Sequence, residues 1–369
     1  MTTATQIRTR KTQPTPPPRA LSYDKVRNLF GMMVAELERH VFGQAKLVRE
    51  VVQAILSGQI LLIVGPSGVG KTHVVEVAIK IFGLKGEVVP LNPEVTAEEI
   101  TGFPIFDRAS GKMVHHEGPF GRGNQLVVLD EENRTSDKNQ NGQLYVLNNK
   151  EVVIDGQRYP LAQPFTVIMT MNPPEVDGTR DLISALVDRI DVAVWVGQPN
   201  INGSQLEAFF ECLKYWRNPP EINILRGDSA SAASGNGHQP MSQPVAEISD
   251  ARQTINQLRS YMPDQILRLV CVIVRHFIVS GIFAHEPSIR TLNAMAQKAL
   301  IQAITQDGRQ PQAKHVWDVA SQCLLLYETE EYMTTADKIQ VIDRELKKLK
   351  DQATSLGRGG LDRLWAQYR

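Results

Sequence analysis

Eight residues of the chain have the composition and spacing of a phosphate-binding loop. They read GPSGVGKT from Gly65 to Thr72, a full GxxxxGKT pattern, directly after the apolar run Ile60–Val64. Such glycines let backbone N–H groups turn toward phosphate oxygens, and the start of the following helix adds its positive dipole end. In this pattern Lys71 reaches the β- and γ-phosphates and the Thr72 hydroxyl binds magnesium. The residues predicted to hold the nucleotide phosphates are Gly65, Pro66, Ser67, Gly68, Val69, Gly70, Lys71, Thr72 and His73.

Two acids form the next candidate group. Asp130 and Glu131 directly follow the apolar run Leu126–Leu129. Ligands bind at the carboxyl ends of parallel strands, so both acids are predicted to lie beside the loop. Asp130 is the candidate magnesium ligand, and Glu131 is the candidate for orienting an attacking water. Two acids in this position can also cap the next helix, but the upstream loop favours the catalytic role.

Asn172 follows the next buried run, Phe165–Thr170. Its amide can hydrogen-bond a γ-phosphate or a water molecule at the same edge of the sheet. The alternative is an asparagine that starts a turn before Pro173. Its position along the predicted sheet favours the functional role.

These residues need a sheet to position them. Five short apolar runs, separated by helix-length segments, predict an α/β fold with a parallel sheet and crossover helices that ends near residue 198. The runs are Ile60–Val64, Glu87–Pro90, Leu126–Leu129, Phe165–Thr170 and Val192–Val196. Apolar residues at three- and four-residue spacing predict two further helices between Ser22 and Ser57.

The chain divides by composition into four parts. Residues 1–20 have four bases, no acid and three successive prolines, which is typical of a disordered basic arm. Residues 21–198 form the α/β domain. Residues 199–332 have helical periodicity, interrupted at 226–245 by a segment rich in Ser, Gly, Ala and Pro that we expect to be a flexible surface loop. Residues 333–369 are predicted to be an amphipathic helix and a tail.

The composition excludes several classes of protein. Forty Lys and Arg balance 40 Asp and Glu, which argues against a uniformly basic nucleic-acid binder. The zero sum combines +4 at residues 1–20 and +3 at residues 333–369 with −7 elsewhere. Three cysteines without a CxxC pair and an N-terminus without a secretory signal predict a cytoplasmic protein. The most apolar stretch, Ile266–Ala284, contains Arg268, Arg275 and His276, so we expect a buried helix and not a membrane span.

With these elements in order, the chain resembles the AAA+ ATPases, and more narrowly their MoxR-type branch with its magnesium-chelatase relatives, over residues 22–328. The motifs that carry the resemblance are Val41–Gln44, Gly65–Thr72, Gly118–Phe120, Asp130–Arg134, Thr170–Pro173, Leu186–Arg189 and Pro287–Arg290. The DExNR and GPF motifs are the most specific of these. The resemblance implies a P-loop NTPase sheet followed by a helical AAA+ lid domain, with ATP and Mg²⁺ as cofactors and a hexameric ring of identical subunits.

The resemblance also assigns roles by position. It implies that Gly43 and Gln44 lie beside the adenine, that Asn172 is the sensor-one residue, that Arg189 is the finger for a neighbour's γ-phosphate, and that Arg290 is the sensor-two residue on the lid. An arginine supplied by a neighbour would link hydrolysis to assembly. For Arg189 the alternative is an ion pair with Asp188 or Asp191 of the same chain. Arg180 is the second candidate for the finger.

Two predicted hairpins also resemble this branch. One is formed by residues 103–115 and the other by residues 152–159, with Asp155-Gly156 as a two-residue turn. In relatives such hairpins project toward the ring pore or a client, so Phe103, Phe106 or Tyr159 could contact it. Each of these side chains alone is more often a packing residue.

The expected function is an ATP-hydrolysing ring that remodels, assembles or activates a partner protein. The resemblance suggests a protein with a von Willebrand A domain as that partner. One alternative is a nucleotide-gated scaffold in which ATP drives assembly and turnover is incidental. Another is a nucleic-acid-associated motor that uses the basic ends of the chain.

Overall fold

The computed structural model of the chain describes most of the α/β part and most of the helical part. The described residues are 22–41, 43–174, 176, 178–197, 244–327, 329, 333–357 and 359–368. The predicted basic arm at residues 1–20, and the predicted loop from residue 226 as far as residue 243, lie outside them.

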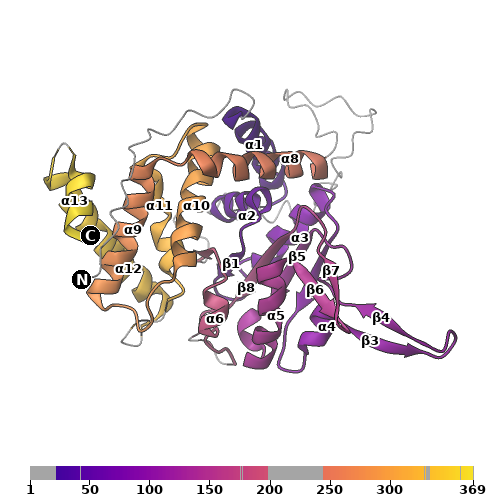
Figure 1. Cartoon of the computed structure of the whole chain (residues 1–369). Helices are drawn as coiled ribbons and strands as arrows, with labels where there is room; N and C mark the ends of the chain where they lie inside the picture. The colour runs from indigo at the N-terminus through magenta and orange to yellow at the C-terminus, as the bar shows by residue number, and fades with distance from the viewer. Residues whose placement is uncertain are drawn as a thin grey trace, which may run out of the picture.

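A five-stranded parallel sheet forms the centre of the α/β part (Figure 1). Its strands, in their order across the sheet, are β2 (Gly86–Pro90), β5 (Leu126–Asp130), β8 (Thr166–Met171), β1 (Leu61–Val64) and β9 (Val192–Trp195). Continuous apolar runs suit these strands because both faces of such a sheet are covered. The predicted fold class, a parallel sheet with flanking helices followed by a helical region, is confirmed.

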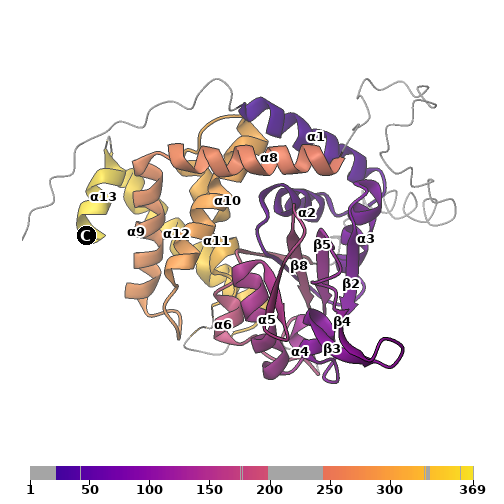
Figure 2. The ribbon, with the colours of Figure 1, turned by 45° about the vertical axis from the view of Figure 1, so that its right-hand side comes forward.

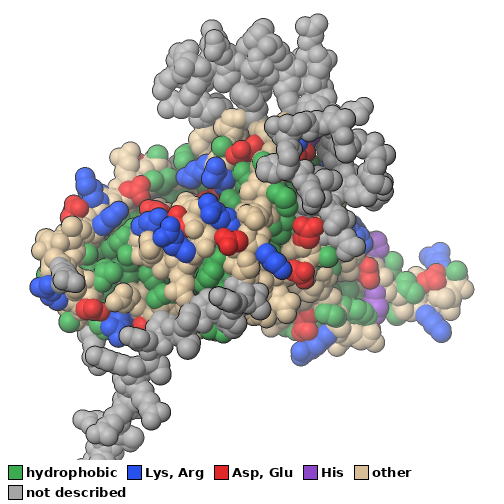
Figure 3. All heavy atoms as spheres, turned by 90° about the horizontal axis from the view of Figure 1, so that it is seen from above, with side chains coloured by type: hydrophobic (Ala, Val, Ile, Leu, Met, Phe, Trp, Pro, Cys, Tyr) green, Lys and Arg blue, Asp and Glu red, His purple; other side chains and the backbone are tan. Residues whose placement is uncertain are grey.

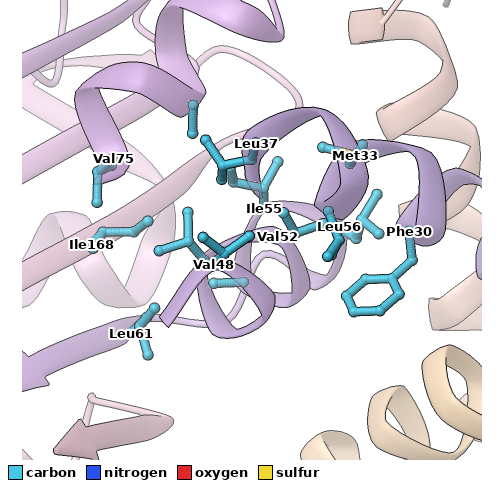
Figure 4. Close-up of a cluster of buried hydrophobic side chains, with 14 of the residues drawn as sticks. Phe30, Met33, Leu37, Val48, Val52, Ile55, Leu56, Leu61, Val75 and Ile168 are labelled. Atoms are coloured by element: carbon cyan, nitrogen blue, oxygen red, sulfur yellow. The ribbon is translucent and has the colours of Figure 1, made fainter. Parts of the chain in front are cut away.

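Alternate residues of each strand pack against two different helical layers. The helical elements of this part are α1 (Tyr23–Glu38), α2 (Ala45–Ser57), α3 (Lys71–Ile81), α4 (Ala97–Thr101), the 3-10 turn η1 (Glu132–Arg134), α5 (Asp137–Asn149) and α6 (Ser184–Val187). Leu61 and Ile63 pack with α1, α2 and α3, and Figure 4 shows Leu61 and Ile168 beside side chains of α2. Leu62 and Val64 belong to the core on the opposite face, with α5 and α6. The two helices predicted between Ser22 and Ser57 are therefore α1 and α2.

Two antiparallel hairpins extend from the sheet. They consist of β3 (Gly102–Asp107) with β4 (Lys112–Glu117) and of β6 (Glu151–Ile154) with β7 (Gln157–Pro160). The β3–β4 hairpin projects away from the body in Figures 1, 2 and 3, and Phe106 on it is 61% exposed. The predicted turn at Asp155 and Gly156 is confirmed, with φ values of 50° and 74°. The rings of His115 and Tyr159 meet edge to face, 5.4 Å between centroids, so the hairpins contact each other.

The C-terminal part is helical. Its elements are α8 (Pro244–Leu258), the 3-10 turn η3 (Arg259–Tyr261), α9 (Asp264–Ser280), α10 (Ile289–Asp307), α11 (Ala313–Leu324), α12 (Thr335–Ser355) and α13 (Gly360–Tyr368). Our prediction that the 226–245 loop extends to Val245 is wrong, because α8 already begins at Pro244, and proline is well tolerated in a first helical turn. The predicted tail contains α13, whose Leu364 is buried in the same core as α9. Within the described residues, no helix is long and apolar enough to cross a membrane.

The first helix of this part packs on the α/β part. Ile248 and Ile255 of α8 belong to the core that contains α1 and α2. Arg252 of α8 donates from Nη1 to Phe165 O at 2.7 Å and from Nη2 to Thr166 Oγ1 at 2.8 Å. The predicted domain boundary at residue 199 places helix α8 in the helical domain, although its buried side chains complete the core of the α/β part.

A buried polar network joins the two parts a second time. Lys298 of α10, 2% exposed, donates to Glu50 Oε2 of α2 and to Gln53 Oε1, the latter at 2.5 Å. Gln322 of α11 donates to Glu50 Oε1 at 3.0 Å. A buried charge whose partner is removed is costly, so this network fixes how α10 and α11 sit on α2.

We expect Glu50→Ala to lower the free energy of unfolding by about 3 to 5 kcal/mol, because it leaves the Lys298 ammonium buried without its counter-ion. Chemical denaturation of the full chain measures this loss. The control is Arg39→Ala, which removes an exposed ion pair with Glu36 and should cost no more than about 1 kcal/mol. Equal losses for the two variants would contradict the structural role of the network.

Candidate functional site

The Gly65–Thr72 loop connects β1 to α3 and is held close to the neighbouring strand. A side chain at Gly65 would come within 2.3 Å of Val196 O, so only glycine fits there. Gly70 precedes α3 with φ of 83°, a left-handed conformation that glycine adopts without strain. A Cβ at Gly68 or Gly70 would meet no atom within 4 Å, so at these two positions backbone conformation and not lack of space favours glycine. The backbone thus forms a cradle at the N-terminus of α3.

Lys71 lies at the centre of the site. Its Nζ donates to Gly65 O at 2.7 Å, to Pro66 O at 2.9 Å and to Asn172 Oδ1 at 3.0 Å. Burial lowers the pKa of the Lys71 ammonium, and the nearby charges of Asp130 and Glu131 oppose that effect. The Lys71 ammonium therefore links the loop to Asn172, which directly follows β8.

Asp130, at the end of β5, accepts two short hydrogen bonds on the same oxygen. Thr72 Oγ1 and Thr170 Oγ1 each donate to Asp130 Oδ1 at 2.6 Å. The predicted neighbours Thr72 and Asp130 are therefore in direct contact. Thr170 is fully buried and is a site residue that the sequence reasoning missed. The signal available for it was its place at the end of the strand beside β5.

Glu131 has a left-handed backbone, with φ of 62° and ψ of 47°, which is unusual for a residue with a side chain. Its N–H donates to Thr170 Oγ1 at 3.0 Å. Its Oε1 accepts from Asn172 Nδ2 at 3.4 Å, and its Oε2 lies 2.7 Å from Arg134 Nε. One carboxylate oxygen therefore accepts a hydrogen bond, and the other forms an ion pair, within the same chain.

Asn133 lies behind these residues and is another position that the sequence reasoning did not assign. Its Nδ2 donates to Asn172 O at 2.9 Å, and its carbonyl accepts from Arg180 N at 3.0 Å. The side chain of Arg180 is exposed. Asn133 thus ties the segment after β8 to the turn after β5.

The remaining predicted nucleotide contacts surround the loop. Gln44, next to Gly43, precedes α2, and its Nε2 donates to Val69 O at 2.8 Å. Gly43 has φ of 71°. His73 is exposed on the first turn of α3. Residues 43 and 44 therefore lie against the 65–72 loop.

Arg189 and Arg290 lie near each other and form a separate group. Burial lowers the pKa of the Arg189 guanidinium, and the positive charge of Arg290 lowers it further, whereas Asp188 raises it. Among the described residues, no ion pair joins Arg189 to Asp188 or Asp191, and neither arginine hydrogen-bonds the 65–72 loop. Asp191 instead accepts from Ile60 N at 2.8 Å.

The edge of the sheet therefore combines oxygen ligands with positive charge. A hydroxyl and a carboxylate in contact suit Mg²⁺, which binds one or two carboxylates together with phosphate oxygens and water. Within the part of the chain that the structure describes, no three His, Cys, Asp or Glu residues form a metal cage. The chemistry of Thr72, Asp130 and Lys71 fits a phosphate-bound magnesium ion.

Comparisons with known proteins agree with this architecture. Residues 60–192 match the family described as ATPase family associated with various cellular activities (AAA). The chain is 32% identical over 174 residues to the uncharacterized protein YeaC of Bacillus subtilis, covering 47% of this chain and 54% of YeaC. It is 30% identical over 167 residues to Chaperone MoxR1 of Mycobacterium tuberculosis, covering 45% of this chain and 44% of MoxR1. The chain thus spans about half the length of these relatives.

A solved structure shares the fold. The crystal structure of a proposed ATPase from Cytophaga hutchinsonii superposes with a TM-score of 0.68 and 21% sequence identity. The match covers 88% of this chain and 96% of that one, so the likeness includes the sheet and the helical part.

The residue after Glu131 gives a prediction on pH. Glu132 is fully buried, and burial raises the pKa of its carboxyl from 4.5 to about 8, while a hydrogen bond from Gln143 Nε2 lowers it. The folded state therefore holds a proton that the unfolded state releases between these values, so the Glu132 contribution to stability is lost as the pH rises from 4.5 to about 8. Glu132→Gln should remove this loss, which is about 1.4 kcal/mol for each pH unit between the two pKa values.

Chemical denaturation at pH 5 and pH 8 of the full chain and of Glu132→Gln measures the effect. The variant should gain stability relative to the natural chain at the higher pH. If the free energies of unfolding of the two proteins differ by the same amount at both pH values, Glu132 is not buried and protonated as described. The matched control is Glu98→Gln, an exposed acid in the first turn of α4.

Proposed function

Because the chain belongs to the MoxR-type branch of the AAA+ ATPases, we propose that it hydrolyses ATP and uses the cycle to remodel, assemble or activate a partner protein. The observation that carries this proposal is the convergence of Lys71, Asp130, Glu131 and Asn172 on one edge of the sheet. A cation, a metal-binding carboxylate and a water-orienting carboxylate are the parts that phosphoryl transfer to water requires.

Each residue has a role in this proposal. Lys71 and the N–H groups of the loop bind the phosphates, and Thr72 and Asp130 would hold Mg²⁺, which would neutralise charge on the phosphate oxygens. Glu131 orients the attacking water, with Asn172 beside it. Gly43 and Gln44 border the adenine. Residues Gly65, Pro66, Ser67, Gly68, Val69, Gly70 and His73 complete the nucleotide site.

The proximity of Arg189 and Arg290 supports a ring of identical subunits, with six as the proposed number. Two guanidinium groups repel each other unless an anion lies between or beside them. Neither hydrogen-bonds the 65–72 loop of its own chain, so a neighbour's γ-phosphate is the acceptor that we propose for both. Arg180 is exposed near Asn133 and stays the alternative finger.

The client is proposed to be a protein, and a von Willebrand A domain protein is our first candidate. MoxR1, a relative of this chain, is named a chaperone. The exposed β3–β4 hairpin, with Ile105 at 42%, Phe106 at 61% and Met113 at 56% exposed, offers apolar side chains to such a client. The cysteines Cys271 and Cys323 are unpaired thiols, which supports the proposed cytoplasmic location.

The ion pair between Arg134 and Glu131 favours a second candidate function. In this conformation Glu131 Oε2 lies 2.7 Å from Arg134 Nε, so that oxygen is directed toward the guanidinium and not toward a water molecule, and turnover would be slow. In that case the protein is a nucleotide-gated scaffold, and ATP-dependent assembly is the function.

Lys71→Ala should weaken ATP binding by about 100-fold, because it removes a charge-assisted contact to the phosphates. Calorimetric titration of the full chain with ATP and Mg²⁺ measures this. Lys80→Ala, an exposed lysine near the end of the same helix, is the matched control and should bind ATP normally. Tight ATP binding by Lys71→Ala would overturn the proposed site.

Glu131→Gln separates the two candidate functions. We expect this variant to bind ATP and to assemble, but to release phosphate at least about 100-fold more slowly, because the amide cannot orient water as the carboxylate does. Phosphate release and ring size are measured together, and proteins retained by the ATP-bound variant are identified. If Glu131→Gln still remodels the partner, the protein is a nucleotide-gated scaffold, and the proposal that ATP hydrolysis drives remodelling is rejected.

A further inference from the structure

The surface that carries Arg189 and Arg290 is built from two segments that are distant in the chain. Arg189 lies between α6 and β9, whereas Arg290 lies in the first turn of α10. One buried side chain lies between these segments. It is Tyr327, which follows α11 and is 7% exposed. The centroid of its ring lies 5.6 Å from that of Phe283.

The hydroxyl of Tyr327 contacts both segments. It donates to Asp188 Oδ1 at 3.3 Å, accepts from Ser288 N at 3.4 Å and is hydrogen-bonded to Thr291 Oγ1. A carboxylate only accepts and a backbone N–H only donates, so the single phenolic hydrogen points to Asp188 and the Thr291 hydroxyl donates to Tyr327. Burial raises the pKa of Tyr327, which keeps the hydroxyl protonated near neutral pH.

These contacts lie next to the two arginines. Asp188 precedes Arg189 in the chain, and Ser288 and Thr291 flank Arg290. Ser288 is also the N-cap of α10, since its Oγ accepts from Arg290 N at 3.2 Å. The backbones that carry the two cations are therefore linked through one oxygen atom, although the cations themselves repel each other.

We propose that Tyr327 is a positioning residue for ATP hydrolysis, whose hydroxyl sets the spacing of Arg189 and Arg290 so that both meet the nucleotide phosphates of a neighbouring subunit. The proposal rests on the proposed function, because it requires hydrolysis and an arginine acting between subunits. It adds a residue outside the phosphate site that joins the helical part to the arginine segment of the α/β part.

The first test is Tyr327→Phe, which keeps the ring and removes only the hydroxyl. We expect kcat for ATP hydrolysis to fall about 10- to 100-fold, as misplacement of reacting groups does, with KM for ATP unchanged because the phosphate loop is intact. The matched control is Tyr368→Phe on α13, which removes a 2.8 Å hydrogen bond between the Tyr368 hydroxyl and His276 Nδ1 of α9 and should keep the natural kcat. Unfolding midpoints of both variants separate this effect from a loss of stability.

The second test mixes two variants of the full chain, each with lowered ATP hydrolysis. Tyr327→Phe subunits retain Glu131, and Glu131→Gln subunits retain a correctly held arginine pair. When the two variants are mixed in equal amounts, about one quarter of the head-to-tail interfaces in a ring join an intact Glu131 on one subunit to a correctly held arginine pair on the next. ATP hydrolysis should therefore return to about a quarter of the natural value. A residue needed only for folding of its own subunit would give no such recovery.

A parallel mixture of Arg189→Ala with Glu131→Gln separates the possible failures. If that mixture regains activity but the Tyr327→Phe mixture does not, or if Tyr327→Phe alone has the natural kcat, the positioning role is wrong. If neither mixture regains activity, the action of Arg189 between subunits is wrong, and the role of Tyr327 is rejected with it. If the natural chain does not hydrolyse ATP at all, the proposed function itself is overturned.

Discussion

One carboxylate oxygen organises the candidate site. Asp130 Oδ1 accepts from the hydroxyls of Thr72 and Thr170, which joins the first turn of α3, the end of β5 and the end of β8 at one atom. This meeting is possible because β8 lies between β5 and β1 in a parallel sheet, so the three strands end at the same edge. Thr170 then also holds the N–H of Glu131, whose left-handed backbone turns the next residues away from the strand. The sheet order therefore determines which polar groups can act together.

The helical part is attached by polar contacts with defined directions. The Lys298–Glu50 pair joins α10 to α2, and Tyr327 joins the start of α10 to Asp188. Apolar packing tolerates small shifts, whereas a buried charge or hydroxyl loses its partner when the elements move. The position of Arg290 on α10 is therefore set by the same contacts that attach this helix to the α/β part.

The sequence predicted the parts of the fold and site that depend on local patterns. Continuous apolar runs, the GxxxxGKT spacing and the acids after β5 are all visible within a few residues. Thr170 was not assigned a role because its partners, Asp130 and Glu131, belong to another strand and the turn after it, and the contact of Arg134 depends on the left-handed turn at Glu131. The start of α8 at Pro244 was hidden by the composition of the preceding segment, and α13 is too short to show a helical period. The roles of the site residues stay predictions, because they concern a bound nucleotide.

Charge connects the two groups of site residues. The phosphate loop contributes Lys71 and the N-terminus of α3, and its own chain keeps Arg189 and Arg290 elsewhere. Under the proposed function, a neighbour's two arginines would add to this positive charge only when a γ-phosphate is present to balance it, since ATP carries more negative charge than ADP. The arginine pair would then bind most strongly while ATP is intact and lose its counter-charge when phosphate leaves. A ring built in this way would tighten on ATP and loosen after hydrolysis, so the same contact would serve both assembly and the chemical step.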